Sequence, residues 1–187
     1  KVVERAKAAN VGFDKNADIT TGPVIDGRAW ARLKGLVDNA VADGAKLLAG
    51  GGRPAGLNAG HYLAPTVLTD VTETMEVYRQ ETFGPIVSIV SFDDQTDLLR
   101  MANDCEEGGL TAYIFTRDLA RAEHYAAHLR YGEIQINGVK YDIDLPHGGI
   151  GQAGIGHDCS SLALHDYLVQ KRITRALDTT TFGGLNP

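Results

Sequence analysis

The stretch LTAYIFTRDLARAEHYAAHLRYGEIQIN (residues 110–137) predicts two β-strands joined by one α-helix. Its ends, LTAYIFT and EIQIN, are rich in the β-branched and aromatic residues that favour strands. Between them, apolar residues such as Leu119 and Ala122 recur at helical spacing, and Asp118 stands where a helix N-cap is expected. Because a helix connects them, the two strands are expected to be parallel.

The preceding residues extend this pattern toward the N-terminus. IVSIVSF (86–92) is a nearly continuous apolar strand, and TDLLRMAND (96–104) follows it with helical spacing. Strand, helix, strand, helix and strand in succession imply two right-handed crossovers. The sequence therefore predicts an α/β fold of three layers, in which helices cover both faces of a parallel sheet.

The earlier part of the chain predicts one further helix and two extended segments. Asp26 is a plausible N-cap for GRAWARLKGLVDNAVADG (27–44), whose apolar residues form one stripe. AKLLAGG (45–51) and YLAPTVLTDV (62–71) are expected to be extended. Pro65 favours an edge or irregular position for the second of them, because proline donates no hydrogen bond to a strand ladder.

The two ends of the sequence also carry expectations. Residues 1–10 begin inside an amphipathic helical pattern, which predicts that the chain is part of a longer protein. Residues 168–177 alternate in polarity, which predicts a terminal strand that pairs with another chain or domain.

Composition excludes several classes of function. The 187 residues carry a net charge of −6 without a Lys or Arg cluster, which argues against a nucleic-acid partner. The longest apolar runs are far shorter than the ~20 residues that span a bilayer, so no membrane partner is expected. No signal peptide opens the chain, and Cys105 and Cys159 do not make a disulfide framework, so a cytoplasmic location is expected.

The sequence shows no complete catalytic or metal motif. In open α/β sheets ligands bind beyond the carboxyl ends of the strands, which points to the glycine-rich loop 137–155. Its glycines either let backbone approach a ligand or only allow tight turns. His124 and His128 lack an HExxH frame, so no metal site is predicted. Acidic neighbours make Cys105 a poor nucleophile.

Four ordered motifs carry a resemblance to a known family. ETFGPI (81–86), GLTAYIFTRD (109–118), GEIQING (132–138) and LPHGGIGQAGIGHD (145–158) resemble motifs of the aldehyde dehydrogenase superfamily, and the likeness covers about residues 1–177. The resemblance implies oxidation of an aldehyde to a carboxylic acid with NAD or NADP. In that chemistry a cysteine thiolate forms a thiohemiacetal, hydride passes to the nicotinamide, and water releases the acyl-enzyme.

The resemblance places the nucleophile outside this chain. The family's cysteine lies in a Gly-Gln-x-Cys context upstream of such motifs, and neither Cys105 nor Cys159 matches that context. We therefore expect no catalytic residue here, and a chain that is inactive alone. Residues 1–166 are expected to be the second half of the catalytic domain, and residues 167–187 to be a terminal oligomerisation strand and tail of a homo-oligomer.

The resemblance assigns the cofactor contacts to the first of these motifs. Glu81 matches the residue that holds the nicotinamide ribose, and Phe83 matches the aromatic that packs beside the nicotinamide ring. Gly84 and Pro85 are expected to shape the turn that aims both side chains. The residues alone would instead make Glu81 a surface acid and Phe83 a core aromatic.

The resemblance implies that the loop after the last strand borders the tunnel through which the aldehyde enters. Asp142 and Asp144 either favour a cationic aminoaldehyde or are solvated loop acids. The candidate substrate contacts are Asn137, Val139, Tyr141, Asp142, Ile143 and Asp144.

The next motif departs from the usual pattern of the family. His147 replaces Phe, Gly151 replaces Lys and Ala153 replaces Ser. The Pro-His-Gly-Gly start is similar to an aminobutyraldehyde- and betaine-aldehyde-like branch, whereas loss of the Lys implies a looser loop or an impaired enzyme. The residues expected to shape this loop are Pro146, His147, Gly148 and Gly149.

Two other functions stay open at this point. One is a reductase or CoA-acylating relative with the same fold, and the other is a non-enzymatic assembly module. The residues upstream of Lys1 separate them from a dehydrogenase, because only the dehydrogenase needs both the Gly-Gln-x-Cys context and an upstream glutamate base.

Overall fold

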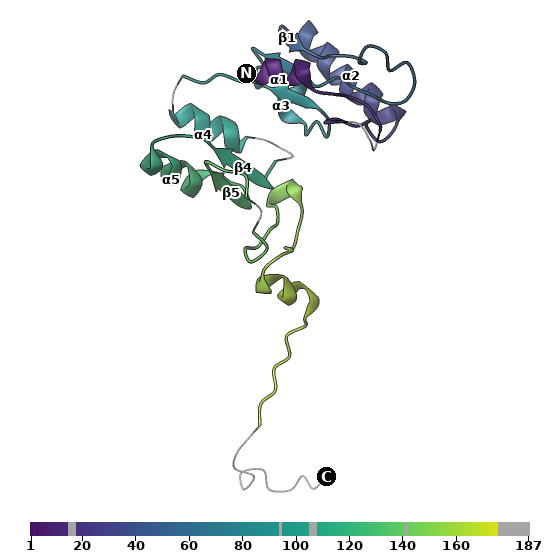
Figure 1. The fold of residues 1–187 in the computed structure, drawn as a ribbon. Helices are drawn as coiled ribbons and strands as arrows, with labels where there is room; N and C mark the ends of the chain where they lie inside the picture. The colour runs from purple at the N-terminus through teal and green to yellow at the C-terminus, as the bar shows by residue number, and fades with distance from the viewer. Residues whose placement is uncertain (15–17, 94, 105–107, 141, 176–187) are drawn as a thin grey trace, which may run out of the picture.

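The computed structural model describes residues 1–14, 18–93, 95–104, 108–140 and 142–175. Its elements form two lobes, followed by a segment that leads away from them toward the C-terminus (Figure 1). The first lobe holds helices α1 (Val2–Ala8), α2 (Gly27–Ala42) and α3 (Glu76–Arg79), and the second holds α4 (Gln95–Asn103) and α5 (Leu119–His128).

The first lobe is built on a mixed three-stranded sheet. Strand β1 (Lys46–Ala49) runs antiparallel to β2 (Thr66–Thr69), and β2 runs parallel to β3 (Ile86–Ser88). Of the two positions expected for the strand at Pro65, the edge position is wrong, because β2 is the central strand, whereas its pairing with β1 is irregular, with a register shift between Leu47 and Ala49. Pro65 lies just before the ladder, whose first N–H, that of Thr66, donates to the Pro85 carbonyl at 2.8 Å.

Helices cover both faces of this sheet. Helices α2 and α3 pack on the face that carries Leu68, and the Asp26 carboxylate caps α2 by accepting from the Ala29 N–H at 2.8 Å. Since successive strand residues point to opposite faces, Val67 belongs to the other face, where it lines a cavity with residues of α1. The main core cluster consists of Val37, Ala40, Ala45, Leu68, Val71, Met75 and Val77.

The second lobe contains the strand–helix–strand unit that residues 110–137 predict. Strands β4 (Thr111–Ile114) and β5 (Glu133–Ile136) are parallel, and α5 connects them. Asp118 caps α5 by accepting from the Arg121 N–H at 3.0 Å, as its position predicts. The sequence therefore predicted this unit correctly, including its helix cap.

The single parallel sheet expected from three successive strands is wrong for the described residues. Strand β3 pairs with β2, while β4 and β5 form a separate sheet. Side chains rather than a strand ladder connect α4 to the first lobe: the Tyr78 hydroxyl donates to the Met101 carbonyl at 2.7 Å, and Arg100 pairs with Glu73 at 2.7 Å. The expected strand at 86–92 is also shorter, and ends at Ser88.

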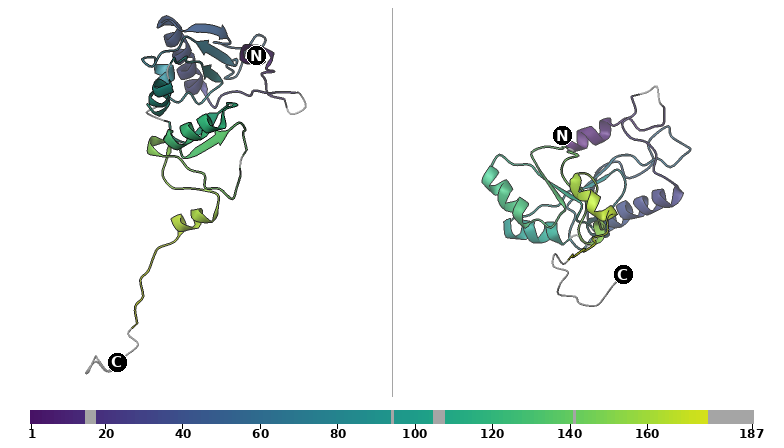
Figure 2. Two further views of the ribbon diagram at one scale, coloured as in Figure 1. Left: turned by 90° about the vertical axis from the view of Figure 1, so that its left-hand side faces the viewer. Right: turned by 90° about the horizontal axis from the view of Figure 1, so that it is seen from below.

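The described C-terminal part contains two short 3-10 helices, η1 (Gly151–Ala153) and η2 (Ser161–Tyr167). Residues 168–175 then run away from both lobes (Figure 2), and they join no strand ladder within the described part of the chain. The terminal strand was expected to pair with another chain or domain, so it stays a prediction, and its last two residues, 176–177, lie outside the described residues. Among the helices described, none is long and apolar enough to cross a membrane.

Candidate functional site

Helix α2 fixes the turn that carries the first motif. Arg32 on this helix donates to the backbone carbonyls of Glu81 at 3.4 Å and Thr82 at 2.5 Å. Gly84 packs against Leu33, since a Cβ at Gly84 would lie 2.5 Å from a Leu33 methyl group. The turn is therefore held from both its polar and its apolar side.

Phe83 and Glu81 both reach into solvent from this turn. Phe83 has a left-handed backbone (φ 48°) and is 80% exposed, so the interpretation of Phe83 as a core residue is wrong. A bulky residue rarely adopts positive φ, and such strain concentrates at functional sites. Glu81 is exposed, which agrees with the prediction from the residues alone that it is a surface acid.

A cavity of about 560 Å³ joins this turn to the second lobe. Glu81 and Phe83 line it from the first lobe, while Leu110 and Thr111 at the start of β4 face it from the second. Gln152 and Ala153 of η1 complete the wall, together with Gly108, Gly109 and Tyr131.

Asn137 locks the carboxyl ends of β4 and β5 together. Its side-chain oxygen accepts from the Thr116 N–H, and its side-chain NH₂ donates to the Thr116 carbonyl, both at 2.8 Å. Its own backbone is left-handed (φ 55°). The structure therefore uses the amide of this expected substrate contact to join two strand ends.

The remaining expected substrate contacts are only partly brought together. Asp142 lines a cavity of about 500 Å³ beside β5, to which Val139, Ile143 and Asp144 do not contribute. Val139 and Ile143 are largely exposed, and Tyr141 lies outside the described residues.

The charge of Asp142 is balanced within the loop. Its carboxylate accepts from the Asp144 N–H and from the Lys140 ammonium, both at 3.2 Å. The pKa of the Asp142 carboxyl lies below its usual value, first because of the Asp144 N–H and then because of Lys140. This ion pair reduces the charge that Asp142 offers to a cationic aldehyde.

Glycines let the 147–158 loop lie directly on the starts of β4 and β5. A Cβ at Gly132 would overlap the Gly148 carbonyl oxygen, and one at Gly109 would overlap the Ile150 carbonyl oxygen. The Gly109 carbonyl accepts from the Ile150 N–H at 3.1 Å. Gly109 and Gly132 lie outside loop 137–155, so these contacts do not decide between ligand approach and tight turns for the glycines of that loop.

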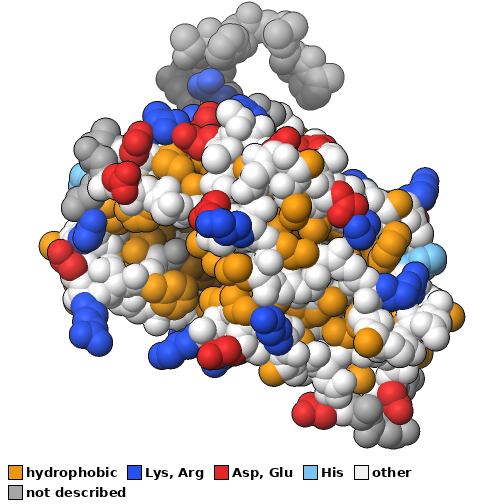
Figure 3. Space-filling view, turned by 90° about the horizontal axis from the view of Figure 1, so that it is seen from above, with side chains coloured by type: hydrophobic (Ala, Val, Ile, Leu, Met, Phe, Trp, Pro, Cys, Tyr) orange, Lys and Arg blue, Asp and Glu red, His pale blue; other side chains and the backbone are white. Residues whose placement is uncertain are grey.

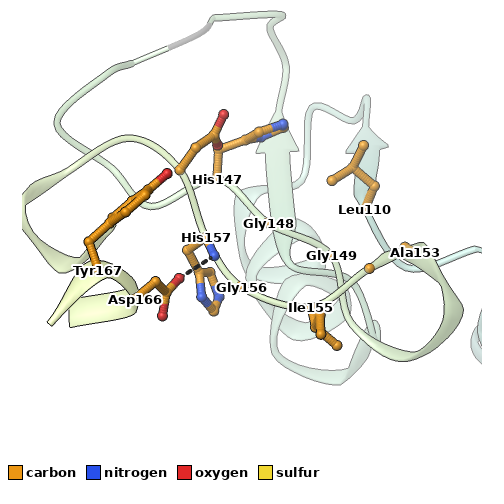
Figure 4. Close-up of a pocket in the computed structure, with 12 residues that line it drawn as sticks. Leu110, His147, Gly148, Gly149, Ala153, Ile155, Gly156, His157, Asp166 and Tyr167 are labelled. Carbon is orange, nitrogen blue, oxygen red and sulfur yellow. Dashed lines mark hydrogen bonds between the residues drawn. The ribbon is translucent and has the colours of Figure 1, made fainter. Parts of the chain in front are cut away.

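Three of the expected loop-shaping residues, His147, Gly148 and Gly149, border a cavity of about 650 Å³, shown in Figure 4. His147 forms an antiparallel backbone bridge with Asp158, and the Asp166 carboxylate accepts from the His157 N–H at 2.9 Å. The rings of His147 and His157 lie well apart in this view, and among the described residues no three His, Cys, Asp or Glu side chains form a metal site. Pro146 lies on the wall of the neighbouring cavity beside β5.

The sequence reasoning missed Glu133, which lies half-buried at the start of β5. Its carboxylate accepts from Gln135 Nε2 at 2.6 Å, Thr111 Oγ1 at 3.2 Å and His147 Nδ1 at 3.2 Å. Burial raises the pKa of this carboxyl, but the hydrogen bonds from Gln135, His147 and Thr111 outweigh burial, and the pKa lies below its usual value. The alternation Glu-Ile-Gln-Ile, which puts two polar side chains on one face of a strand, is the signal that could have revealed it.

Comparison with known proteins identifies close relatives. The family model described as the aldehyde dehydrogenase family matches residues 1–173. Glutarate-semialdehyde dehydrogenase of Pseudomonas aeruginosa is 39% identical over 89% of this chain and 35% of its own length. Betaine aldehyde dehydrogenase of Mesorhizobium japonicum is 37% identical over 92% of this chain and 36% of its own length. The chain thus spans about a third of the length of these relatives.

Solved structures give the same result. Betaine aldehyde dehydrogenase of Staphylococcus aureus, a double mutant in complex with NAD⁺, matches with a TM-score of 0.86 at 31% identity, over 97% of this chain and 38% of its own. Aldehyde dehydrogenase of Mycobacterium tuberculosis, complexed with NAD⁺, matches with a TM-score of 0.83 at 30% identity, over 88% of this chain and 34% of its own. An NADP-dependent enzyme of E. coli matches with a TM-score of 0.81 at 33% identity, over 88% and 34%. This chain belongs to the aldehyde dehydrogenase family.

Proposed function

We propose that this chain forms the nicotinamide side of the cofactor site, and one wall of the substrate channel, in an NAD(P)-dependent enzyme that oxidises an aldehyde to a carboxylic acid. The observation that carries the proposal is the exposed pair Glu81 and Phe83 at the cavity between the lobes. The two relatives named above support the chemistry, because both are dehydrogenases of aldehydes. The solved structures that resemble this chain include NAD⁺ complexes and an NADP-dependent enzyme.

The residues of this turn fit such a cofactor. The Glu81 carboxylate offers paired acceptors to the vicinal hydroxyls of a ribose, and hydrogen bonds to a charged acceptor are the stronger kind. The exposed Phe83 ring offers a flat apolar surface to a nicotinamide. Arg32 holds the carbonyls of Glu81 and Thr82, and Gly84 packs against Leu33, so the turn is ordered before binding and less entropy is lost. The bound NAD(P) would supply the hydride acceptor.

Replacing Glu81 and Phe83, one at a time, in the protein that contains this chain tests these roles. We expect Glu81→Gln to raise the KM for NAD(P) about tenfold, since one charged acceptor is lost. Phe83→Ala is expected to lower kcat, because the ring no longer confines the nicotinamide. Glu123→Gln on α5, also an exposed glutamate, is the matched control and should leave both constants unchanged. Unchanged cofactor kinetics in both Glu81→Gln and Phe83→Ala would contradict the proposal.

The nucleophile is proposed to lie outside this chain, so the 187-residue chain should be inactive alone. Cys159, the cysteine within the described residues, is half-buried, and its sequence context is not that of the nucleophile. Incubation of the isolated chain with NAD and a panel of aldehydes should produce no NADH absorbance. Turnover by the isolated chain would contradict this assignment.

A further inference from the structure

The face of β5 that carries Glu133 and Gln135 forms a network of hydrogen bonds. Glu133 is the centre of this network: one carboxylate oxygen accepts from Thr111 and His147, and the other accepts from Gln135. Thr111 lies directly opposite Glu133 in the β4–β5 register, so the network begins on both strands. A carboxylate only accepts hydrogen bonds, so His147 must present Nδ1 as an N–H donor.

Gln135 extends the network to a second point in the chain. Its side-chain NH₂ donates to Glu133 at 2.6 Å, and its side-chain oxygen accepts from the Lys140 backbone N–H at 2.7 Å. Both polar groups of the Gln135 amide are therefore hydrogen-bonded. Glu133 orients Gln135, and Gln135 holds the loop backbone at Lys140.

The two attachment points are Lys140 and His147, on either side of residues 142–146. The Lys140 N–H is held through Gln135, and the His147 ring is held directly by Glu133. The cavity of about 500 Å³ is lined on the loop side by Asp142, Leu145 and Pro146, which lie between the attachment points. On the strand side it is lined by Glu133 and Gln135. The network therefore sets the distance between this loop and the strand across the cavity.

We infer that Glu133 is a positioning residue, which holds Lys140 and residues 142–147 at the distance from β5 that admits the aldehyde. This inference rests on the proposed function, because the loop is taken to border the substrate channel. Glu133 itself takes no part in bond breaking. Its loss would change how well the aldehyde binds more than how fast bound aldehyde reacts.

Glu133→Gln in the protein that contains this chain is the first test. An amide in place of the carboxylate turns an NH₂ group toward one of three donors, so at least one hydrogen bond is lost. We expect the KM for the aldehyde to rise about tenfold, while kcat and the KM for NAD(P) stay within about twofold. Gln135→Leu should give the same pattern, because it releases Lys140 and leaves the His147–Glu133 contact intact. Glu123→Gln is the matched control.

Amide hydrogen exchange provides a readout that needs no activity. The Lys140 amide should exchange faster in Glu133→Gln and Gln135→Leu than in the unaltered protein, with no change in Glu123→Gln. The inference would be overturned if the variants lost kcat as much as they lost aldehyde binding and also melted at a lower temperature. Glu133 would then have a merely structural role. Unchanged Lys140 exchange in both variants would overturn it as well. A protein that oxidises no aldehyde would refute the proposed function, and the exchange result would then still decide whether the loop is anchored.

Discussion

At the scale of single residues, the site depends on backbone approaches that only glycine allows. Gly132 is such a position, because a Cβ there would overlap the Gly148 carbonyl oxygen, and backbone cannot move aside as a flexible side chain can. We expect Gly132→Ala to lower the free energy of unfolding by about 2 kcal/mol. Gly35 within α2 has open space around it, so Gly35→Ala should raise that free energy by up to about 1 kcal/mol. Urea denaturation measures both, and equal effects of the two substitutions would contradict the packing argument.

At the scale of elements, the Asp26 cap makes the stability of α2 depend on pH. The Ala29 N–H, with a further contribution from Arg28, holds the pKa of the Asp26 carboxyl below its usual value despite some burial. A lowered pKa in the folded state stabilises the protein above the unfolded-state pKa of about 4, and this contribution is lost as the pH falls through the folded-state pKa. Asp26→Asn keeps an acceptor for the Ala29 N–H but removes the charge. Its melting temperature should lie below that of the unaltered chain at neutral pH and converge with it as the pH falls below the folded-state pKa of Asp26.

Asp26→Ala is the companion to that measurement. It removes the cap altogether, so it should melt below Asp26→Asn at neutral pH. If the difference in melting temperature between Asp26→Asn and the unaltered chain stays constant from neutral to acidic pH, the charge of Asp26 contributes nothing to stability.

At the scale of the whole molecule, the exposed apolar surface predicts assembly. Apolar side chains spread over the face in Figure 3 and surround a hollow, and Val169 in the segment leading away from the lobes is 96% exposed. We propose that residues 168–175 pair with the sheet of another subunit, since an extended segment satisfies its backbone by joining a strand edge. Light scattering should give a dimer or larger species, and Val169→Asp should reduce the assembly more than Gln170→Asp does. A homogeneous 20.0 kDa monomer would contradict this prediction.

The sequence predicted those parts of the fold whose signals are local. Helix α5 and its flanking strands were found because helical spacing, an N-cap aspartate and β-branched strand residues all lie within one short stretch. The pairing of β3 was not found, because nothing in IVSIVSF distinguishes β2 from β4 as its neighbour. Strand pairing is settled by packing between residues far apart in the chain.

The features of the candidate site also fall into those that the sequence predicts and those that only the structure shows. By itself, the sequence determined α2 and α5 with their caps, the strand–helix–strand unit and the family, because spacing, capping and ordered motifs are properties of consecutive residues. Only the tertiary structure decided that Phe83 stands exposed in a left-handed turn, that β2 is the central strand and that Glu133 collects three donors. Each of these depends on which distant segments meet, and burial, close backbone approach and hydrogen-bond geometry exist only once they have met.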